Sequence, residues 1–163
     1  MFRSTFILMM VLTVLSSCTY GRVPRGAETT VILLRHADRA AEVLNSKGIA
    51  RANALPFALA EYDIDAIYSP DLKRNLQTAA PLSKATGIPV TTLANEFAAA
   101  RMPRNFPTGT VVWVGNKGNL KSIWDSYHAT GVAPLEYGDI GIIELHKGRA
   151  AKVVRLRFEP AVD

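Results

Sequence analysis

The sequence predicts an α/β protein, a three-layer α/β/α sandwich with a mainly parallel central sheet. From Thr29 onward, short apolar runs alternate with segments of helical periodicity. The run Val31–Leu34 is uniformly apolar, which is typical of a strand covered on both faces. The 163 residues are 48% hydrophobic and 20% charged, a globular composition that suits one domain with a sizeable core.

The N-terminal segment is expected to lie outside this domain. Arg3 precedes an apolar stretch over residues 6–15 and then small residues, which indicates a signal peptide over residues 1–17. The stretch is shorter than the roughly 20 apolar residues that span a bilayer. The sequence LSSC, which ends at Cys18, resembles a bacterial lipobox, whose cysteine becomes the lipidated N-terminus. The alternative is ordinary cleavage near Ser17, with Cys18 an incidental thiol.

Lipidation at Cys18 would anchor the chain in the bacterial cell envelope. Thr19 stands where lipoproteins of the inner membrane commonly carry Asp, so the resemblance favours the outer membrane, facing the periplasm. Residues 18–28 show no periodicity and are expected to form a tether, which leaves residues 29–160 for the domain. Cys18 is the only cysteine, so no disulfide within the chain is expected.

Local signals predict each element of the domain in turn. The expected strands are Val31–Leu34, Ala66–Tyr68, Val90–Leu93 and Val111–Val114, followed by a hairpin of Ile140–Leu145 and Ala151–Phe158 around the turn sequence HKGR. The first expected helix is 45–62, capped by Asn45 and kinked at Pro56. The second is 71–86, with Leu72 and Leu76 inward, a bend at Pro81 and an end at Gly87. The third is indicated by the apolar stripe of Leu120, Ile123, Trp124 and Tyr127 and is expected to end at Gly131. Two prolines between Leu93 and Val111 argue against a full helix there.

The first strand ends in Arg35 and His36, side chains of a kind that rarely end a buried strand. In parallel sheets, the carboxyl ends of the strands border the ligand crevice. Arginine binds a phosphate dianion through a planar fork of donors, and a histidine with one free ring nitrogen can attack phosphorus. The pair therefore predicts phosphoryl chemistry; a surface arginine beside a structural histidine is the alternative.

Four segments resemble the histidine phosphatase superfamily, which has the phosphoglycerate mutase-like fold. VILLRHADRA resembles its R-H-G or R-H-A signature, and LNSKGIARANAL resembles its L-(T/S/N)-x-x-G-x-x-x-A segment. DIDAIYSPDLKRNLQTAAPLSKATGIPV is similar to its Y-S-(S/P)-x-L-x-R-x-x-Q-T-A-x-P-L pattern. YGDIGIIELHKGRAAKVVRLRF is similar to the closing hairpin of its small bacterial members. Together the segments cover essentially Thr29–Phe158.

The resemblance implies a role for each matching residue. His36 is the expected nucleophile, which accepts the phosphoryl group as phosphohistidine, and Arg35 and Arg74 are expected to clamp the phosphate. Ser69 and the amides near it lie where the next helix N-terminus favours an anion. Glu96 is the expected general acid, with a plain loop position as the alternative.

The pattern fails at the second histidine of the family. In VVWVGNKGNL, Asn116 takes that place and is followed by Lys117. Asparagine donates a hydrogen bond without charge, which costs on the order of 1–3 kcal/mol of transition-state stabilisation. Lys117 is a substitute cation if its ammonium group turns inward, and a solvated charge otherwise. His128 and His146 are expected at the surface.

These features predict a cell-envelope phosphatase that hydrolyses a phosphomonoester through His36, with reduced activity. The alternative is a pseudo-phosphatase that binds phosphorylated ligands without turnover; a mutase is a weaker third option. Arg101 and Arg104 are expected to be solvated charges, with substrate contact from this loop as the alternative. No cofactor is implied, and three isolated histidines with one cysteine do not form a metal-ligand cluster. The net charge of +5 is scattered, which argues against nucleic acid as a partner and allows a phosphate anion or phosphorylated small molecule.

Overall fold

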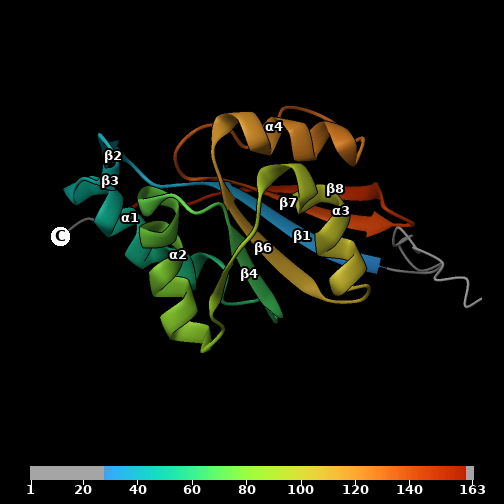
Figure 1. Cartoon of the computed structure of the whole chain (residues 1–163), viewed down its shortest axis with the longest axis horizontal. Coiled ribbons are helices and arrows are strands. Elements are labelled where there is room, and N and C mark those ends of the chain that lie inside the picture. Colours follow the sequence, from blue (N-terminus) through green and yellow to red (C-terminus); the bar gives the residue numbers. More distant parts are fainter. Residues whose placement is uncertain (1–27, 161–163) are drawn as a thin grey trace, which may run out of the picture.

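A six-stranded sheet forms the centre of the computed structural model, which describes residues 28–160 (Figure 1). The sheet order is β5-β4-β6-β1-β7-β8, with β1, β4, β5 and β6 parallel and β7 and β8 antiparallel to their neighbours. The strands are β1 (Glu28–Arg35), β4 (Ala66–Ser69), β5 (Val90–Thr92), β6 (Thr110–Gly115), β7 (Asp139–His146) and β8 (Arg149–Arg157). The predicted α/β class with a mainly parallel sheet is confirmed.

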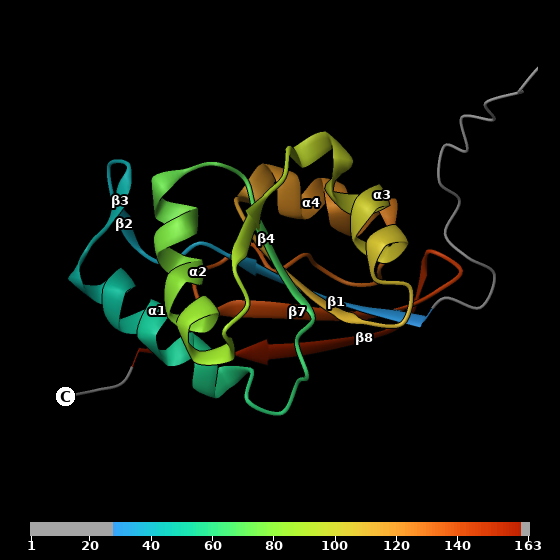
Figure 2. The ribbon, with the colours of Figure 1, turned by 60° about the horizontal axis from the view of Figure 1, so that its bottom comes forward.

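Helices cover both faces of the sheet in the described part of the chain (Figure 2). They are α1 (Ser46–Ala58), α2 (Lys73–Thr86), α3 (Asn95–Asn105) and α4 (Lys117–Ser126). Alternate residues of β1 belong to different cores: Val31 and Leu33 pack with α3 and α4, whereas Ile32 and Leu34 pack with α1 and α2. Burial on both faces explains why this strand is uniformly apolar.

Helix ends follow the capping signals of the sequence in two places. The Asn45 side chain accepts a hydrogen bond from the Gly48 amide and starts α1, and Gly87 adopts a left-handed conformation (φ 74°) that ends α2. The predicted extension of α1 to Tyr62 is wrong, because the helix ends at Ala58. Helix α4 ends at Ser126, before the predicted stop at Gly131.

The predicted inward face of α2 is also wrong. Leu72 is the N-cap residue, and both Leu72 and Leu76 are only partly buried. The buried face instead consists of Asn75, Thr78, Ala79 and Leu82. Hydrophobic periodicity does not identify this face, because two of its buried residues, Asn75 and Thr78, are polar and form hydrogen bonds inside the protein.

Helix α3 occupies the stretch in which two prolines argued against a helix. Pro103 lies in its last turn and has no N–H to donate to the Ala99 carbonyl. The Tyr127 hydroxyl donates to that carbonyl instead, at 2.8 Å. Tyr127 is buried, and this burial raises the pKa of its phenol. A side chain from another helix thus satisfies the acceptor that the proline leaves free.

Two hairpins complete the fold. The closing hairpin turns through Lys147 (φ 53°) and Gly148 (φ 78°), as the sequence HKGR predicts. A second hairpin, β2 (Arg39–Ala40) with β3 (Val43–Leu44), follows β1 and was not expected.

The signal peptide, the lipobox and nearly all of the tether lie outside the described residues. Within residues 28–160, no helix has the length and apolar character needed to cross a membrane.

We expect Tyr127→Phe to lower the free energy of unfolding by about 1–3 kcal/mol, because the buried Ala99 carbonyl loses its donor. In a Pro103→Ala background the loss should shrink, since residue 103 then supplies an N–H. Urea denaturation of the four chains measures both effects, with Tyr62→Phe as the control. An equal loss in both backgrounds would show that the hydroxyl does not substitute for the missing amide.

Candidate active site

Arg35 ends β1 and His36 follows it, so both residues lie where the central parallel strands have their carboxyl ends. Register pairs Arg35 with Gly115 of β6, and the His36 amide donates to the Gly115 carbonyl at 2.9 Å. The site side chains are therefore fixed by the central strands of the sheet. His36 is only 2% exposed.

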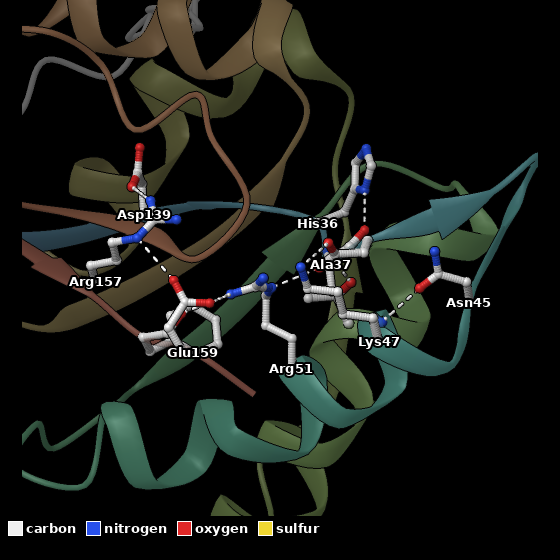
Figure 3. Close-up of polar contacts among 12 residues, drawn as sticks. His36, Ala37, Asn45, Lys47, Arg51, Asp139, Arg157 and Glu159 are labelled. Carbon is white, nitrogen blue, oxygen red and sulfur yellow. Dashed lines mark hydrogen bonds and ion pairs between the residues drawn. The ribbon is translucent and has the colours of Figure 1, made fainter. Parts of the chain in front are cut away.

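One ring nitrogen of His36 is engaged and the other is free. Nδ1 lies 2.9 Å from the Ala37 carbonyl oxygen (Figure 3). A carbonyl only accepts, so this contact assigns the hydrogen to Nδ1 and leaves the lone pair on Nε2. This is the tautomer that a histidine nucleophile requires.

The surroundings of His36 keep its ring neutral. Burial lowers the pKa of His36 from 6.5 to about 4, and the nearby charges of Arg35, Arg74 and Arg39 act in the same direction, against the hydrogen bond to Ala37. The imidazole therefore stays unprotonated at neutral pH.

Arg35 is held from two sides by the segment that precedes β7. Its Nη1 donates to the Leu135 carbonyl at 3.2 Å, and its guanidinium carbon lies 3.9 Å from the centroid of the Tyr137 ring. Its Nε is buried and has no hydrogen-bond partner within residues 28–160.

Arg74 lies in the first turn of α2, as expected, and its charge reaches the imidazole of His36. Its Nη1 pairs with Glu42 at 2.6 Å, and Glu42 is exposed in the turn between β2 and β3. Its Nε is likewise buried without a partner in the described part of the chain. A buried donor without an acceptor costs about 1–3 kcal/mol, so two such donors beside one imidazole indicate a site for an anion.

Buried polar side chains of α2 fasten it to the strand ends. The Thr78 hydroxyl accepts from the Ala37 amide at 2.9 Å and donates to the Arg74 carbonyl at 2.7 Å. Asn75 donates to the Val114 carbonyl at 2.9 Å. These bonds link Arg74 to the segment that carries His36. The sequence analysis did not single out Thr78 or Asn75, although both lie in a segment that resembles the family.

A buried arginine holds the loop after His36. Arg51 of α1 donates from Nε to Asp38 at 2.7 Å, and from Nη1 to the Phe158 carbonyl at 2.9 Å and to Glu159 at 3.0 Å (Figure 3). Burial of Asp38 favours its neutral form, but the hydrogen bond and charge of Arg51 outweigh this and lower the pKa of Asp38. The charged pair therefore ties the loop to α1 and to the end of the closing hairpin.

Asn116 serves as the N-cap of α4. Its side chain accepts from the Asn119 amide at 3.3 Å, and its own amide donates to the Asn119 side chain at 2.9 Å. Because Arg35 pairs with Gly115, Asn116 follows β6 at the level of His36. The position expected to complete the site thus has its side-chain oxygen bound within the helix cap.

Three other expected site residues do not contact His36 in the described structure. Lys117 pairs with Glu136 at 2.9 Å on the surface, so of its two expected orientations the structure shows the solvated one. Ser69 is fully buried and donates its hydroxyl to the Pro70 carbonyl, which leaves that hydroxyl unavailable to an anion. Glu96 is exposed in the first turn of α3 and lines a hollow beside Pro70.

The remaining candidates lie away from the site. Arg101 and Arg104 are exposed in the second half of α3, where Arg101 lies over the Phe97 ring. His128 and His146 are exposed, as expected. Within residues 28–160, no group of three or more histidine, cysteine, aspartate or glutamate side chains is arranged to hold a metal ion.

Comparisons with known proteins bear on the sequence and on the fold. The sequence profile of the histidine phosphatase superfamily (branch 1) matches residues 29–95, which include Arg35, His36 and Arg74. No curated protein sequence matches the chain.

Solved structures with the same fold share little sequence with this chain. The protein histidine phosphatase SixA complexed with tungstate has a TM-score of 0.64 at 16% identity, covering 78% of this chain and 96% of that one. YhfR of Bacillus stearothermophilus has a TM-score of 0.62 at 18% identity, with coverage of 75% and 94%. The mycobacterial glucosyl-3-phosphoglycerate phosphatase with inorganic phosphate has a TM-score of 0.58 at 14% identity, with coverage of 81% and 97%. The chain thus has the phosphoglycerate mutase-like fold, and the first half of its domain is similar in sequence to the histidine phosphatase superfamily.

Proposed function

We propose that the chain is a phosphatase that hydrolyses a phosphomonoester through a phosphohistidine at His36. One observation carries the proposal: a buried, neutral imidazole lies in the field of two arginines. Within residues 28–160, its Nε2 is free and each arginine has a buried Nε–H without an acceptor. Tungstate in the SixA structure and phosphate in the mycobacterial phosphatase are tetrahedral oxyanions, and such an anion suits these donors.

In the proposed reaction, the Nε2 lone pair of His36 attacks phosphorus and the bond to the leaving oxygen breaks. Arg35 and Arg74 neutralise the non-bridging oxygens. The ring becomes cationic when the N–P bond forms, and the Nδ1–H bond to the Ala37 carbonyl stabilises that cation. Water then attacks phosphorus and returns a proton to the group that protonated the leaving oxygen, the P–N bond breaks, and phosphate and neutral His36 result.

The leaving oxygen takes up a proton in the first step. Glu96 is the proposed donor, from the first turn of α3. Glu42 is a second carboxyl near the site, but it is already paired with Arg74 at 2.6 Å. An aryl phosphate avoids this requirement, because an aryloxide leaves without protonation, and is therefore the better first substrate.

A binding protein without turnover is the second candidate. The capping role of Asn116 favours it, since that side chain adds no positive charge to the site. We propose reduced activity rather than none, because His36 retains the tautomer and the neutral state that attack requires.

We further propose that the mature chain is a lipoprotein of the cell envelope, anchored at Cys18 after removal of residues 1–17, with a tether over residues 18–28 and the domain over 29–160. The LSSC sequence and the apolar stretch before it support this. β1 begins at Glu28 and reaches the site only at its other end, so an anchored domain would hold His36 away from the lipid.

Turnover of p-nitrophenyl phosphate tests the proposed function. We expect slow hydrolysis by the chain, a loss of at least about 1000-fold in His36→Ala, and no change in the control His146→Ala. Asn116→His should raise the rate by about 5- to 100-fold, because it restores a cationic donor, while losing about 1 kcal/mol of stability with the cap. Phosphate binding with no turnover in either chain would instead support the binding protein.

The pH dependence of His36 gives a second prediction. Its pKa is lowered in the folded chain, so the unfolded chain binds the proton first as the pH falls. The contribution of His36 to stability is thus complete above pH 6.5 and is lost progressively towards pH 4. NMR titration of the ring should give a midpoint near 4, which rises when inorganic phosphate binds. A midpoint near 6.5 would contradict a buried, neutral ring.

Replacement of Cys18 tests the proposed anchor. In bacteria expressing the full chain, we expect the protein in the membrane fraction, labelled by a fatty-acid probe, and Cys18→Ser should lose the label and the membrane association. Ser17→Ala is the matched control, because it keeps the cysteine. Membrane association that survives Cys18→Ser would reject lipid anchoring at this residue.

A further inference from the structure

The segment Leu135–Tyr137 borders His36 from a third side, and neither the sequence patterns nor the proposed chemistry gives it a role. The Tyr137 ring centroid lies 5.8 Å from that of His36, with the two planes tilted by 57°. The same ring lies 3.9 Å from the guanidinium carbon of Arg35. Tyr137 is the aromatic side chain that the described structure brings against both residues.

The position of this segment is fixed by contacts on either side of Tyr137. Glu136 pairs with Lys117, the first residue of α4, so the segment passes the helix end that Asn116 caps. Glu136 and Asp139 exchange hydrogen bonds, each at 3.3 Å. Gly138 has φ 87° and packs so closely against the Phe158 carbonyl that a Cβ would clash. The ring is therefore presented from a defined turn.

The contacts of Arg35 leave its remaining donors free for an anion. A stacked ring contacts the face of a guanidinium and leaves its N–H edge open. Leu135 takes Nη1, and the buried Nε stays without a partner in the described residues. Stacking on Tyr137 thus fixes the plane of the guanidinium without competing for the donors that face a ligand.

We propose that Tyr137 is a positioning residue of the phosphate site: its ring holds the Arg35 guanidinium in the plane that binds the anion and shields one side of the His36 ring from water. The inference rests on the proposed function. The ring of Tyr137 carries this role. The Tyr137 hydroxyl has no hydrogen-bond partner within residues 28–160 and is dispensable.

The test compares Tyr137→Leu, which removes the ring, with Tyr137→Phe, which keeps it. Tyr62→Leu is the matched control, since Tyr62 is half-buried and packs on the core with α1 and α2, before β4. Calorimetric titration of the full chain with inorganic phosphate should give a Kd about 3- to 30-fold weaker for Tyr137→Leu, and within about twofold of the unaltered chain for Tyr137→Phe and Tyr62→Leu.

Two NMR signals report on the ring without any ligand. In Tyr137→Leu, the Arg35 guanidinium should rotate faster and the His36 titration midpoint should rise, because water reaches the ring; in Tyr137→Phe both signals should stay as in the unaltered chain. Unchanged signals and affinity in Tyr137→Leu would overturn the inference, as would a Phe variant that is as impaired as the Leu variant. Failure of the unaltered chain to bind phosphate would reject the proposed function, whereas the two NMR signals still decide the role of Tyr137.

Discussion

The site depends on the burial of a neutral imidazole among arginine side chains. Cations around a histidine favour its deprotonated form, and burial does the same, so the pKa of His36 falls to about 4. The Ala37 carbonyl then selects the tautomer that leaves Nε2 free. A binding site for an anion would gain from a protonated ring, so a ring kept neutral supports the proposed nucleophilic attack.

The protein maintains this arrangement with polar contacts that reach from the site into the fold. Thr78 links the backbone at Ala37 to the first turn of α2, where Arg74 lies. Arg51 fastens the loop after His36 to the end of the closing hairpin. Burying charged and hydroxyl groups costs free energy unless they are paired, and here each bond aligns a group that the site needs. Two other contacts do not serve the site in this way. Glu42 pairs with Arg74, which would otherwise be free for an anion, and Asn116 caps α4 where a cationic side chain would help to bind one.

Local signals in the sequence were enough for much of the fold and for the centre of the site. The apolar run of β1, the cap at Asn45, the stop at Gly87 and the turn at Gly148 are each decided by neighbouring residues, and so is the place of Arg35 and His36 at a strand end. Long-range contacts decided the rest. Helix α3 tolerates Pro103 because Tyr127 supplies a donor from another helix, and Leu135 reaches Arg35 across 100 residues of chain. The sequence makes Lys117 a candidate phosphate ligand, because nothing in the neighbouring residues shows that it forms an ion pair with Glu136.

The most direct test of the account is to trap the covalent intermediate. The full chain is incubated briefly with a ³²P-labelled phosphomonoester, quenched in alkali, which preserves phosphohistidine, and digested to map the label. The account predicts label on Nε2 of His36 and no label in His36→Ala. The label should be greater when the reaction is quenched early in turnover than after the substrate is consumed. Hydrolysis without label at His36, or label on another residue, would contradict it.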